Sequence, residues 1–524
     1  MANSRTLHAS PQKLPASGPA REALREKGQF WTPAWLARAM AAWVTEEKPA
    51  ELFDPAVGPG TFFSAARAVG FEGGLRGFEL DHTAFAGCGK LGLDASDFGG
   101  VAVGDFLQAG IGELFPAIIS NPPYIRHHRL GDARKAELKD YARRTLGFAL
   151  DGRAGLQAYF LIKCLTMLAP GGRLAFLLPA DVCEGFSSRP LWNWIAEHFR
   201  IEAVLSFAET AAPFPQVDTN AMVFFLSQNP PAATLLWCRV EEPDGDAILR
   251  AVGNGVRYGA KTETVKILRR ETKEAIATGL SRSPAPPDQD GYPLSRFARV
   301  MRGIATGENE FFFFTYAQLR EAKLPERFFR RAIGRTRDCP GAVISPEDLE
   351  ALDAAGRPTW LLNLGDQPME SFPAPLRAHL ERGEHAGIPR GALVQTRRPW
   401  YRMEQRTPPP LLFAYLGRRD CRFVLNRSSV VPLTGFLCVY PHDDTPKNVE
   451  RLWRALNHPL TLRNLVYVAK SYGSGALKVE PRQLEHLKIP FTVAEQIGLL
   501  PREAADQLVL LETPHKRKRH CSKR

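Results

Sequence analysis

The sequence predicts a doubly wound α/β fold built on a mixed sheet, followed by a second domain of the α+β class. Up to about residue 230, buried apolar segments of strand length alternate with amphipathic segments of helix length. Strands that are buried on both faces need helices on both sides of their sheet. A Pro- and Asp-rich break at 281–293 then separates this part from short β-like runs that are mixed with helices and rich in Arg.

Each element of the first part is predicted from a local pattern. A helix is expected after Thr32 and Pro33 within residues 21–44, with Thr32 as its N-cap and Pro33 in its first turn. Further helices are predicted at 60–70, 156–172 and 188–199. Strands are predicted at 50–57, 74–81, 100–107, 116–123, 173–182, 200–209 and, as the last of the series, 219–227.

In the second domain, β-like runs are expected at 299–315, 409–416 and 421–426, and the Phe run within 308–314 is expected to be a core strand. The predicted organisation is a disordered tail at 1–20, a catalytic domain at 21–280, a linker at 281–293, a second domain at 294–505 and a basic tail at 506–524.

The composition favours a polyanionic partner. The 524 residues carry a net charge of +12, with nucleic acid as the first candidate partner and an anionic membrane surface as the second. No apolar stretch approaches the length that spans a bilayer, and the start of the chain lacks an apolar signal core. The eight cysteines are scattered without a CxxC pair, which disfavours a disulfide framework or zinc site and predicts a reducing, cytoplasmic setting.

Three acidic residues and a glycine-rich turn indicate a cofactor site. Asp54 ends the first predicted strand, Gly58 and Gly60 follow it, and Glu79 and Asp105 lie at the ends of the next two strands. Glycines let the backbone approach a ligand, and a carboxylate at a strand end can hold a ribose diol. No phosphate-binding loop accompanies them, so a nucleoside without phosphates, such as S-adenosylmethionine, fits best. The alternative is that Asp54 and Asp105 are helix caps.

The stretch Asn121-Pro122-Pro123-Tyr124 ends a strand with a rigid polar and aromatic tip. The side-chain carbonyl of Asn121 and the main-chain carbonyl of Pro122 match the two hydrogens of an exocyclic amine. Accepting both would expose the nitrogen lone pair to a methyl donor, while Tyr124 offers a face on which a base can stack. An amine inside a duplex is out of reach, so the base would have to flip out.

In these motifs the sequence resembles the Taq-type, gamma-class N6-adenine DNA methyltransferases of restriction–modification systems. GQFWTP at 28–33 is similar to the family's N-terminal cofactor motif, DPAVGPGTFF to its glycine-rich loop and NPPY to its catalytic motif. The stretches GIATGENEFFFF, RRPWYRMEQR and SYGSGALKVEPRQLEHLKIP resemble its target-recognition domain. One departure is Val57-Gly58-Pro59, where the family usually has small or polar residues; it removes no side-chain ligand.

The resemblance implies a Rossmann-like S-adenosylmethionine-dependent methyltransferase fold with a C-terminal target-recognition domain. It implies a flipped adenine held by Asn121, Pro122, Tyr124 and Phe214, with the first three also catalytic. The cofactor contacts it implies are Thr32, Asp54, Pro55, Gly58, Gly60, Glu79, Asp105, Phe106 and Asn121. No metal, covalent nucleophile or strong base is needed, because positioning and electrostatics carry the reaction.

Basic and aromatic clusters are the candidate contacts to DNA, since arginines grip phosphates or guanine edges. They are Arg126, His127, His128, Arg129, Arg397, Arg398, Trp400, Tyr401, Arg402, Lys470, Ser471 and Lys478. Two other interpretations stay open for them: a solvated face packed over Trp400, and a zinc site formed by 126–129 with a remote cysteine.

The function expected is therefore site-specific methylation of adenine N6 in double-stranded DNA by a monomer, with a separately encoded endonuclease as a candidate partner. An NPPY enzyme acting on ribosomal RNA or on a protein glutamine is a second hypothesis. A catalytically silent, sequence-specific DNA-binding protein is a third. The intact Asn121 and Tyr124 argue against the third.

Overall fold

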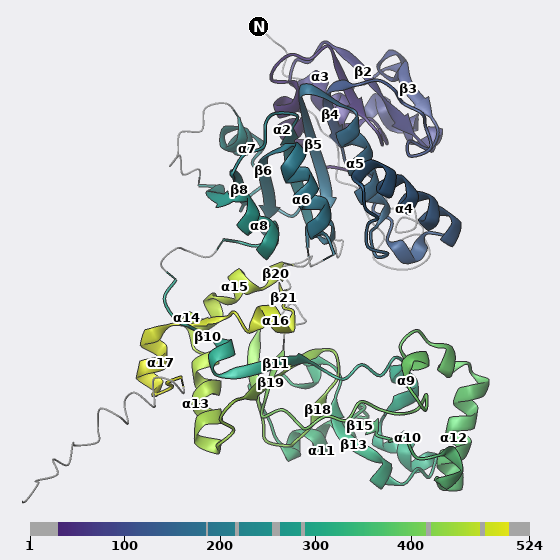
Figure 1. Cartoon of the computed structure of the whole chain (residues 1–524), viewed down its shortest axis with the longest axis vertical. Coiled ribbons are helices and arrows are strands. Elements are labelled where there is room, and N and C mark those ends of the chain that lie inside the picture. Colours follow the sequence, from purple (N-terminus) through teal and green to yellow (C-terminus); the bar gives the residue numbers. More distant parts are fainter. Residues whose placement is uncertain are drawn as a thin grey trace, which may run out of the picture. The chain divides into compact units, whose positions relative to one another are not determined.

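The computed structural model describes residues 30–184, 187–214, 220–253, 263–284, 289–414, 421–471 and 477–501. These residues fall into two compact units (Figure 1). The first unit ends at Pro284, and the second comprises the residues from 285 on, apart from 471–475. The first unit thus reaches into the predicted linker 281–293. The connecting stretch is also shorter at its other end, because Tyr292 and Pro293 pair with Lys488 and Ile489 in the second unit.

The first unit is built on a nine-stranded mixed sheet in the order β3-β2-β1-β4-β5-β7-β6-β8-β9. Strands β3 to β5 run parallel, and β7 is antiparallel to both β5 and β6. The strands are β1 (Glu51–Asp54), β2 (Gly74–Glu79), β3 (Gly100–Val103), β4 (Phe115–Ser120), β5 (Leu168–Pro179), β6 (Arg200–Phe207), β7 (Ala221–Ser227), β8 (Thr234–Val240) and β9 (Val265–Glu271).

Helices cover both faces of this sheet, which confirms the predicted doubly wound α/β class. Along β5, Leu174, Phe176 and Leu178 pack on one face, whereas Ala175 and Leu177 pack on the other. The first face is covered by α4 (Asp132–Leu146), α5 (Leu156–Thr166), α6 (Arg189–His198) and α8 (Thr272–Thr278). The second is covered by α2 (Ala34–Thr45), α3 (Thr61–Ala68) and α7 (Gly245–Val252).

The order of strands creates a switch point between β1 and β4. Strand β2 lies on one side of β1 and β4 on the other, so the connections leave in opposite directions. In open α/β sheets the crevice at the carboxyl ends of two such strands is the usual ligand site. Here those ends are Asp54 and Ser120, next to the two motifs singled out in the sequence.

Three predictions for this unit are wrong. Pro33, not Thr32, is the N-cap of α2, and it makes no side-chain capping bond. The helix predicted at 156–172 ends at Thr166, and β5 begins at Leu168. The strand at 221–227 is not the last, because β8 and the edge strand β9 follow it. Much of β9 is exposed, so its polar residues hide the strand pattern.

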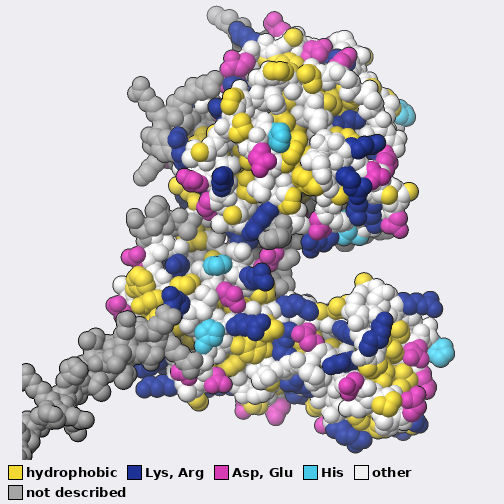
Figure 2. All heavy atoms as spheres, viewed as in Figure 1, with side chains coloured by type: hydrophobic (Ala, Val, Ile, Leu, Met, Phe, Trp, Pro, Cys, Tyr) yellow, Lys and Arg dark blue, Asp and Glu magenta, His cyan; other side chains and the backbone are white. Residues whose placement is uncertain are grey.

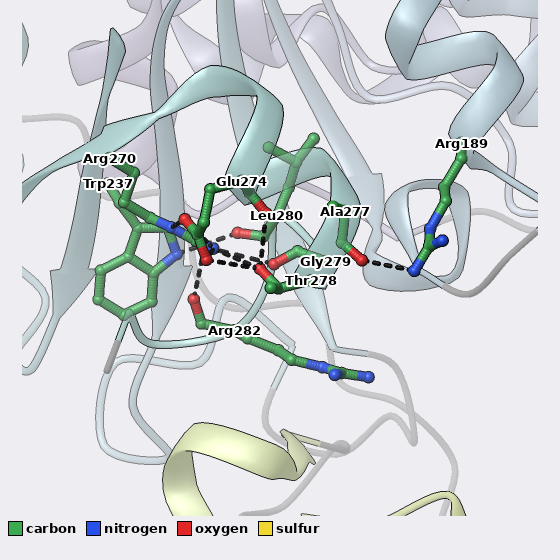
Figure 3. A network of polar contacts seen from close by, with 9 residues as sticks. All are labelled: Arg189, Trp237, Arg270, Glu274, Ala277, Thr278, Gly279, Leu280 and Arg282. Carbon is green, nitrogen blue, oxygen red and sulfur yellow. Dashed lines mark hydrogen bonds and ion pairs between the residues drawn. The ribbon is translucent and has the colours of Figure 1, made fainter. Parts of the chain in front are cut away.

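Arg270 fastens the end of the first unit to its sheet (Figure 3). Its side chain is only 1% exposed, lies on β9 and pairs with Glu274 of α8 at 3.0 Å. The guanidinium also donates to Thr278 Oγ1 at 2.7 Å and to the Arg282 carbonyl at 2.8 Å. The indole of Trp237 on β8 donates to the Leu280 carbonyl at 3.0 Å. These bonds hold α8 and the turn after it against β8 and β9.

The second unit contains a five-stranded sheet, β11-β19-β16-β17-β14, a four-stranded sheet, β12-β15-β13-β18, and the pair β10-β22; β20 and β21 form a further pair of strands. The strands are β10 (Tyr292–Pro293), β11 (Ala298–Arg302), β12 (Phe313–Phe314), β13 (Phe329–Ile333), β14 (Val343–Ile344), β15 (Trp360–Leu362), β16 (Leu411–Ala414), β17 (Arg422–Asn426), β18 (Val431–Pro432), β19 (Phe436–Pro441), β20 (Lys470–Ser471), β21 (Leu477–Lys478) and β22 (Lys488–Ile489).

The helices of this unit are α9 (Asn309–Phe312), α10 (Tyr316–Glu321), α11 (Pro346–Ala354), α12 (Ala374–His385), α13 (Pro446–Leu456), α14 (Pro459–Arg463), α15 (Leu465–Val468), α16 (Pro481–Leu484) and α17 (Phe491–Ile497). The predicted α+β class is confirmed. The strand expected at 308–314 is wrong for its first half, because Asn309–Phe312 form α9 and only Phe313–Phe314 form a strand. Within the described residues, no helix is long and apolar enough to cross a membrane.

Candidate functional site

The glycine-rich turn lies between the end of β1 and the start of α3, at the switch point of the sheet. Gly58 and Gly60 have φ angles of 55° and 90°, in the left-handed region that favours glycine. A Cβ on Gly60 would also stand 2.6 Å from Leu93 and 2.8 Å from Phe98, so the position has no room for a side chain. Pro55 is buried within the same turn. The turn is thus fixed by backbone conformation and packing, and Pro59 is accommodated in it.

Asp54 is buried and connects the glycine-rich turn to the end of β4. Its Oδ1 accepts hydrogen bonds from the Ala56 amide at 3.0 Å and from Ser120 Oγ at 3.1 Å. Among the described residues, its Oδ2 has no partner. Burial, with the charge of Glu79 adding to it, raises the pKa of Asp54 to about 7. The helix-cap alternative is wrong for Asp54, because Gly60 is the N-cap of α3.

Glu79 joins the glycine-rich turn to the neighbouring strand. Its Oε2 accepts from the Gly58 amide at 2.7 Å and its Oε1 from the Asp81 amide at 2.9 Å. Each carboxylate oxygen has a second lone pair, so these bonds leave acceptor capacity for the two hydroxyls of a ribose. The donor and acceptor set therefore fits a nucleoside at the turn.

Asp105 and Phe106 form the next part of the same edge. Asp105 Oδ1 accepts from the Leu107 amide at 2.9 Å, and Oδ2 pairs with Arg134 of α4 at 2.6 Å. This carboxylate caps a turn that does not begin a helix, because the next regular element of the described chain is β4. The amide N–H of Phe106 makes no hydrogen bond to any described residue. A carboxylate acceptor beside a free N–H is the complement of the amine and ring nitrogen on the edge of adenine.

The candidate catalytic tip, Asn121–Tyr124, follows β4 directly, as the sequence predicts. The Asn121 side-chain nitrogen donates to the Phe30 carbonyl at 2.6 Å and to Thr32 Oγ1 at 3.2 Å. These two acceptors fix which end of the amide is nitrogen, and therefore leave its oxygen as an acceptor. Neither that oxygen nor the Pro122 carbonyl accepts a hydrogen bond from any described residue. Adjacent residues thus present two unused acceptors.

Three aromatic rings gather beside these acceptors. The Tyr124 and Phe214 rings lie 6.4 Å apart between centroids, and Phe30 lies 5.9 Å from the first and 5.6 Å from the second. Tyr124 is buried, its hydroxyl has no partner among the described residues, and burial raises its pKa well above the ordinary value. The structure therefore brings together Asn121, Pro122, Tyr124 and Phe214.

The candidate DNA contacts are placed less uniformly. Residues His127–Arg129 form a 3-10 turn with exposed or half-buried side chains, next to the catalytic tip in sequence. In the second unit, Arg398 and Arg402 are exposed, whereas Tyr401 is only 4% exposed and donates its hydroxyl to the Gln367 carbonyl at 2.6 Å.

Other candidates in this group also pack inward. Arg397 donates to the Ala305 carbonyl at 2.7 Å, and Trp400 donates to Glu384 at 3.1 Å. On the face drawn in Figure 2, Lys and Arg side chains are interspersed with hydrophobic and acidic ones. Lys470, Ser471 and Lys478 lie on β20 and β21, and their side chains are outside the described part. Their DNA contacts stay predictions.

Sequence reasoning missed four residues of the site. Phe30 could have been predicted, because it lies inside the GQFWTP motif. The role of Ser120 follows only from its hydrogen bond to Asp54 in the structure. Arg134 and Lys163 lie on helices α4 and α5 and contact the turn that begins at Asp105. The sequences of these helices do not indicate that contact. In the described chain, no group of three or more His, Cys, Asp or Glu residues is placed to hold a metal ion.

Comparison with known proteins identifies the family that the chain resembles. Residues 98–214 match the Eco57I restriction-modification methylase family, and residues 286–511 match the C-terminal domain of type II methyltransferase M.Eco57I. The chain is 23% identical to type II methyltransferase M.AccI of Acinetobacter calcoaceticus, over 93% of this chain and 89% of that protein. It is 25% identical to M.XamI of Xanthomonas campestris pv. amaranthicola, over 88% and 85%.

Among solved structures, the type IIL restriction-modification enzyme MmeI in complex with DNA has a similar fold. It superposes with a TM-score of 0.50 at 13% identity, over 94% of this chain and 75% of that one. The family matches and the relatives, together with the fold, indicate a methyltransferase that uses S-adenosylmethionine. The chain is a DNA methyltransferase of the restriction–modification type, as the sequence resemblance implied.

Proposed function

We propose that this enzyme methylates the N6 amine of adenine at a specific site in double-stranded DNA, after flipping the base out of the duplex. The observation that carries the proposal is the pair of unused acceptors on Asn121 and Pro122. An exocyclic amine has two hydrogens, and two adjacent carbonyl oxygens can accept both. Phe30, Tyr124 and Phe214 supply the apolar surroundings that a planar base needs.

The residues of the chain act on the amine by position and charge. Asn121 and Pro122 would draw both hydrogens out of the base plane, so that the nitrogen lone pair faces the methyl donor. S-adenosylmethionine, when bound, supplies the electrophilic methyl group. The amine nitrogen held by Asn121 and Pro122 would take up this methyl group and lose one proton, while the cofactor would leave as its thioether. The acceptors stabilise the positive charge that builds on nitrogen.

The proposed cofactor contacts are those that surround the turn after β1. Glu79 would hold the ribose, Asp105 and Phe106 the adenine edge, and Asp54 would lie nearest the cationic part of the cofactor. The turn glycines allow the close approach of the main chain. We propose that Thr32 acts through Asn121 and does not contact the cofactor, because its hydroxyl oxygen accepts a hydrogen bond from the Asn121 side-chain amide.

We also propose a cytoplasmic monomer whose second unit selects the DNA sequence, acting beside a separately encoded endonuclease. The relatives M.AccI and M.XamI are type II methyltransferases that align along most of this chain, which supports this arrangement. The catalytic role of the first unit rests on the site described above.

The proposal is tested by offering tritiated S-adenosylmethionine with duplex DNA, RNA or protein separately, and by identifying the labelled nucleoside. We expect label in DNA, as N6-methyladenine. N4-methylcytosine would refute adenine as the methylated base but would agree with methylation of an exocyclic amine. Label in RNA or protein alone would refute duplex DNA as the substrate.

A further inference from the structure

Lys163 is a buried lysine behind the turn that begins at Asp105. It lies on α5, where its side chain is 7% exposed among apolar residues of the core. Its ammonium donates to the Phe106 carbonyl at 2.5 Å and to the Ala109 carbonyl at 2.6 Å. It also stands 4.7 Å from the centre of the Phe106 ring, which is a cation–π contact. All of these partners belong to the turn that begins at Asp105.

A lysine at this place is costly unless it is fully engaged. Burial of an ammonium in an apolar environment is unfavourable, and burial accordingly lowers the pKa of Lys163. The neighbouring α5 residues Leu161, Ile162 and Leu165 are fully or almost fully buried apolar side chains, so packing alone would be met by leucine or methionine. What only a lysine supplies here is a charged donor to two main-chain carbonyls of one turn.

The same turn presents the groups that fit the adenine end of a nucleoside. The Phe106 N–H has no partner among the described residues, and the carboxylate of Asp105 lies next to it in the chain. Lys163 holds the carbonyl of the peptide group that joins Phe106 to Leu107, and the N–H of this same peptide group donates to Asp105 Oδ1. The Phe106 N–H lies on the adjoining peptide group, linked through the Phe106 Cα. A shift of the carbonyl would therefore move the Leu107 N–H that orients the Asp105 carboxylate and would release the backbone rotation at Phe106 that sets its own N–H.

We propose that Lys163 is a positioning residue that sets the Asp105–Phe106 backbone for the adenine ring of S-adenosylmethionine. It does not contact the cofactor, and it acts from the opposite side of the turn. The inference rests on the proposed placement of the cofactor at this turn, and not on which base of DNA is methylated.

The test uses the full-length chain and measures binding of S-adenosylmethionine, S-adenosylhomocysteine and adenosine by calorimetry. The variants are Lys163→Met, which keeps the length of the side chain and removes the donor, and Lys163→Arg, which keeps the charge but replaces the ammonium with a guanidinium. Lys266→Met is the matched control, because Lys266 is an exposed, ion-paired lysine on β9, with its amine 2.8 Å from Glu241. Duplex DNA binding is measured in parallel for all variants.

We expect Lys163→Met to weaken all three ligands by a similar factor of about tenfold, since the adenine end is common to them. The methylation rate at saturating cofactor should stay within about twofold of wild type, so that the loss is in KM. Lys163→Arg should fall between wild type and Lys163→Met, and Lys266→Met should match wild type.

Adenosine affinity within twofold of wild type in Lys163→Met overturns the inference, as does a loss confined to S-adenosylmethionine. If Lys163→Met does not fold, Lys163→Arg decides: a threefold or greater loss of adenosine affinity supports the role, and a smaller one overturns it. Methylation of cytosine by the wild type would refute the proposed base and leave this inference standing, because the readout is cofactor binding.

Discussion

At the scale of single residues, hydrogen bonds and short stretches of main chain join the glycine-rich turn to the Asn121–Tyr124 tip. Glu79 holds the glycine-rich turn, Asp54 at the start of that turn accepts from Ser120, and Asn121 follows Ser120 directly. On its other side, Asn121 is held by Phe30 and Thr32. The orientation of the catalytic amide is thus built from residues more than sixty positions apart in sequence.

The role of Thr32 can be separated from cofactor binding. Thr32→Val keeps the shape and removes the oxygen that accepts from Asn121, so we expect the methylation rate to fall about tenfold. Cofactor affinity should stay within about twofold, and Thr32→Ser should behave like wild type. The measurement is single-turnover methylation beside calorimetric cofactor binding. A weakened cofactor with an unchanged rate would instead assign Thr32 to the cofactor, as the family resemblance implied.

The raised pKa of Asp54 gives a pH dependence with a definite sign. The carboxyl ionises near pH 3.8 in an unfolded chain but near 7 in the folded protein, so it favours folding at low pH. That contribution is lost as the pH rises through this window and is gone above about 7. Asp54→Asn cannot ionise and lacks the dependence. Denaturant unfolding at several pH values should show wild type losing stability relative to Asp54→Asn from pH 4.5 to 7.5; a constant difference would contradict the assignment.

At the scale of elements, the sheet places the site and the added strands stabilise it. The parallel strands β1, β2 and β4 bring Asp54, Glu79 and Asn121 to one edge, because their carboxyl ends lie together. Strands β8 and β9 extend the sheet beyond the site, and the Arg270 network fastens α8 to them. This far part carries no proposed site residue, so its contribution is to stability.

Arg270→Ala should therefore destabilise the first unit without changing the chemistry. Its removal leaves the partly exposed Glu274 unpaired and the Arg282 carbonyl without its donor, a loss of about 3 kcal/mol in the free energy of unfolding. Arg250→Ala is the control, because Arg250 is exposed and its ion pair with Asp244 is long, at 3.9 Å. Its cost should be below about 0.5 kcal/mol. Equal stabilities for the two variants, measured by denaturant unfolding, would contradict this role for the network.

The buried strands and the NPPY tip could be predicted because their patterns are local. The strand before Asn121 is apolar over Ala117–Ile119, and the turn after Asp54 is marked by glycines. Helix α4 was missed because only Leu138, Ala142 and Leu146 are buried along its fifteen residues. Lys163 was missed because its role depends on a turn 54 to 57 residues away, a contact that the fold alone creates.

At the scale of the whole molecule, the two compact units are predicted to have different functions. The first carries the residues proposed to bind the cofactor and the base, and the second carries most of the arginine-rich candidates for DNA contact. The net charge of +12 predicts an electrostatic component of DNA binding that does not depend on the sequence bound.

DNA affinity should consequently fall steeply with salt. From about 50 to 200 mM salt we expect a loss of at least tenfold in affinity for duplex DNA, because released counterions drive phosphate contacts. Cofactor affinity serves as the internal control and should change by less than about twofold, since no phosphate is involved. Fluorescence anisotropy with a labelled duplex measures the first quantity. A flat salt dependence would exclude the basic residues as phosphate contacts.

The central claim is that Asn121 and Pro122 hold an adenine amine for methylation. Sequencing that detects modified bases, applied to DNA from cells expressing either the wild type or Asn121→Ala, tests it most directly. Asn229→Ala, which alters an asparagine bonded to Ser227 on β7, is the control. We expect N6-methyladenine at one recurring sequence with wild type and Asn229→Ala, and none with Asn121→Ala. Methylated adenine that persists in Asn121→Ala, or a different modified base in the wild type, would contradict it.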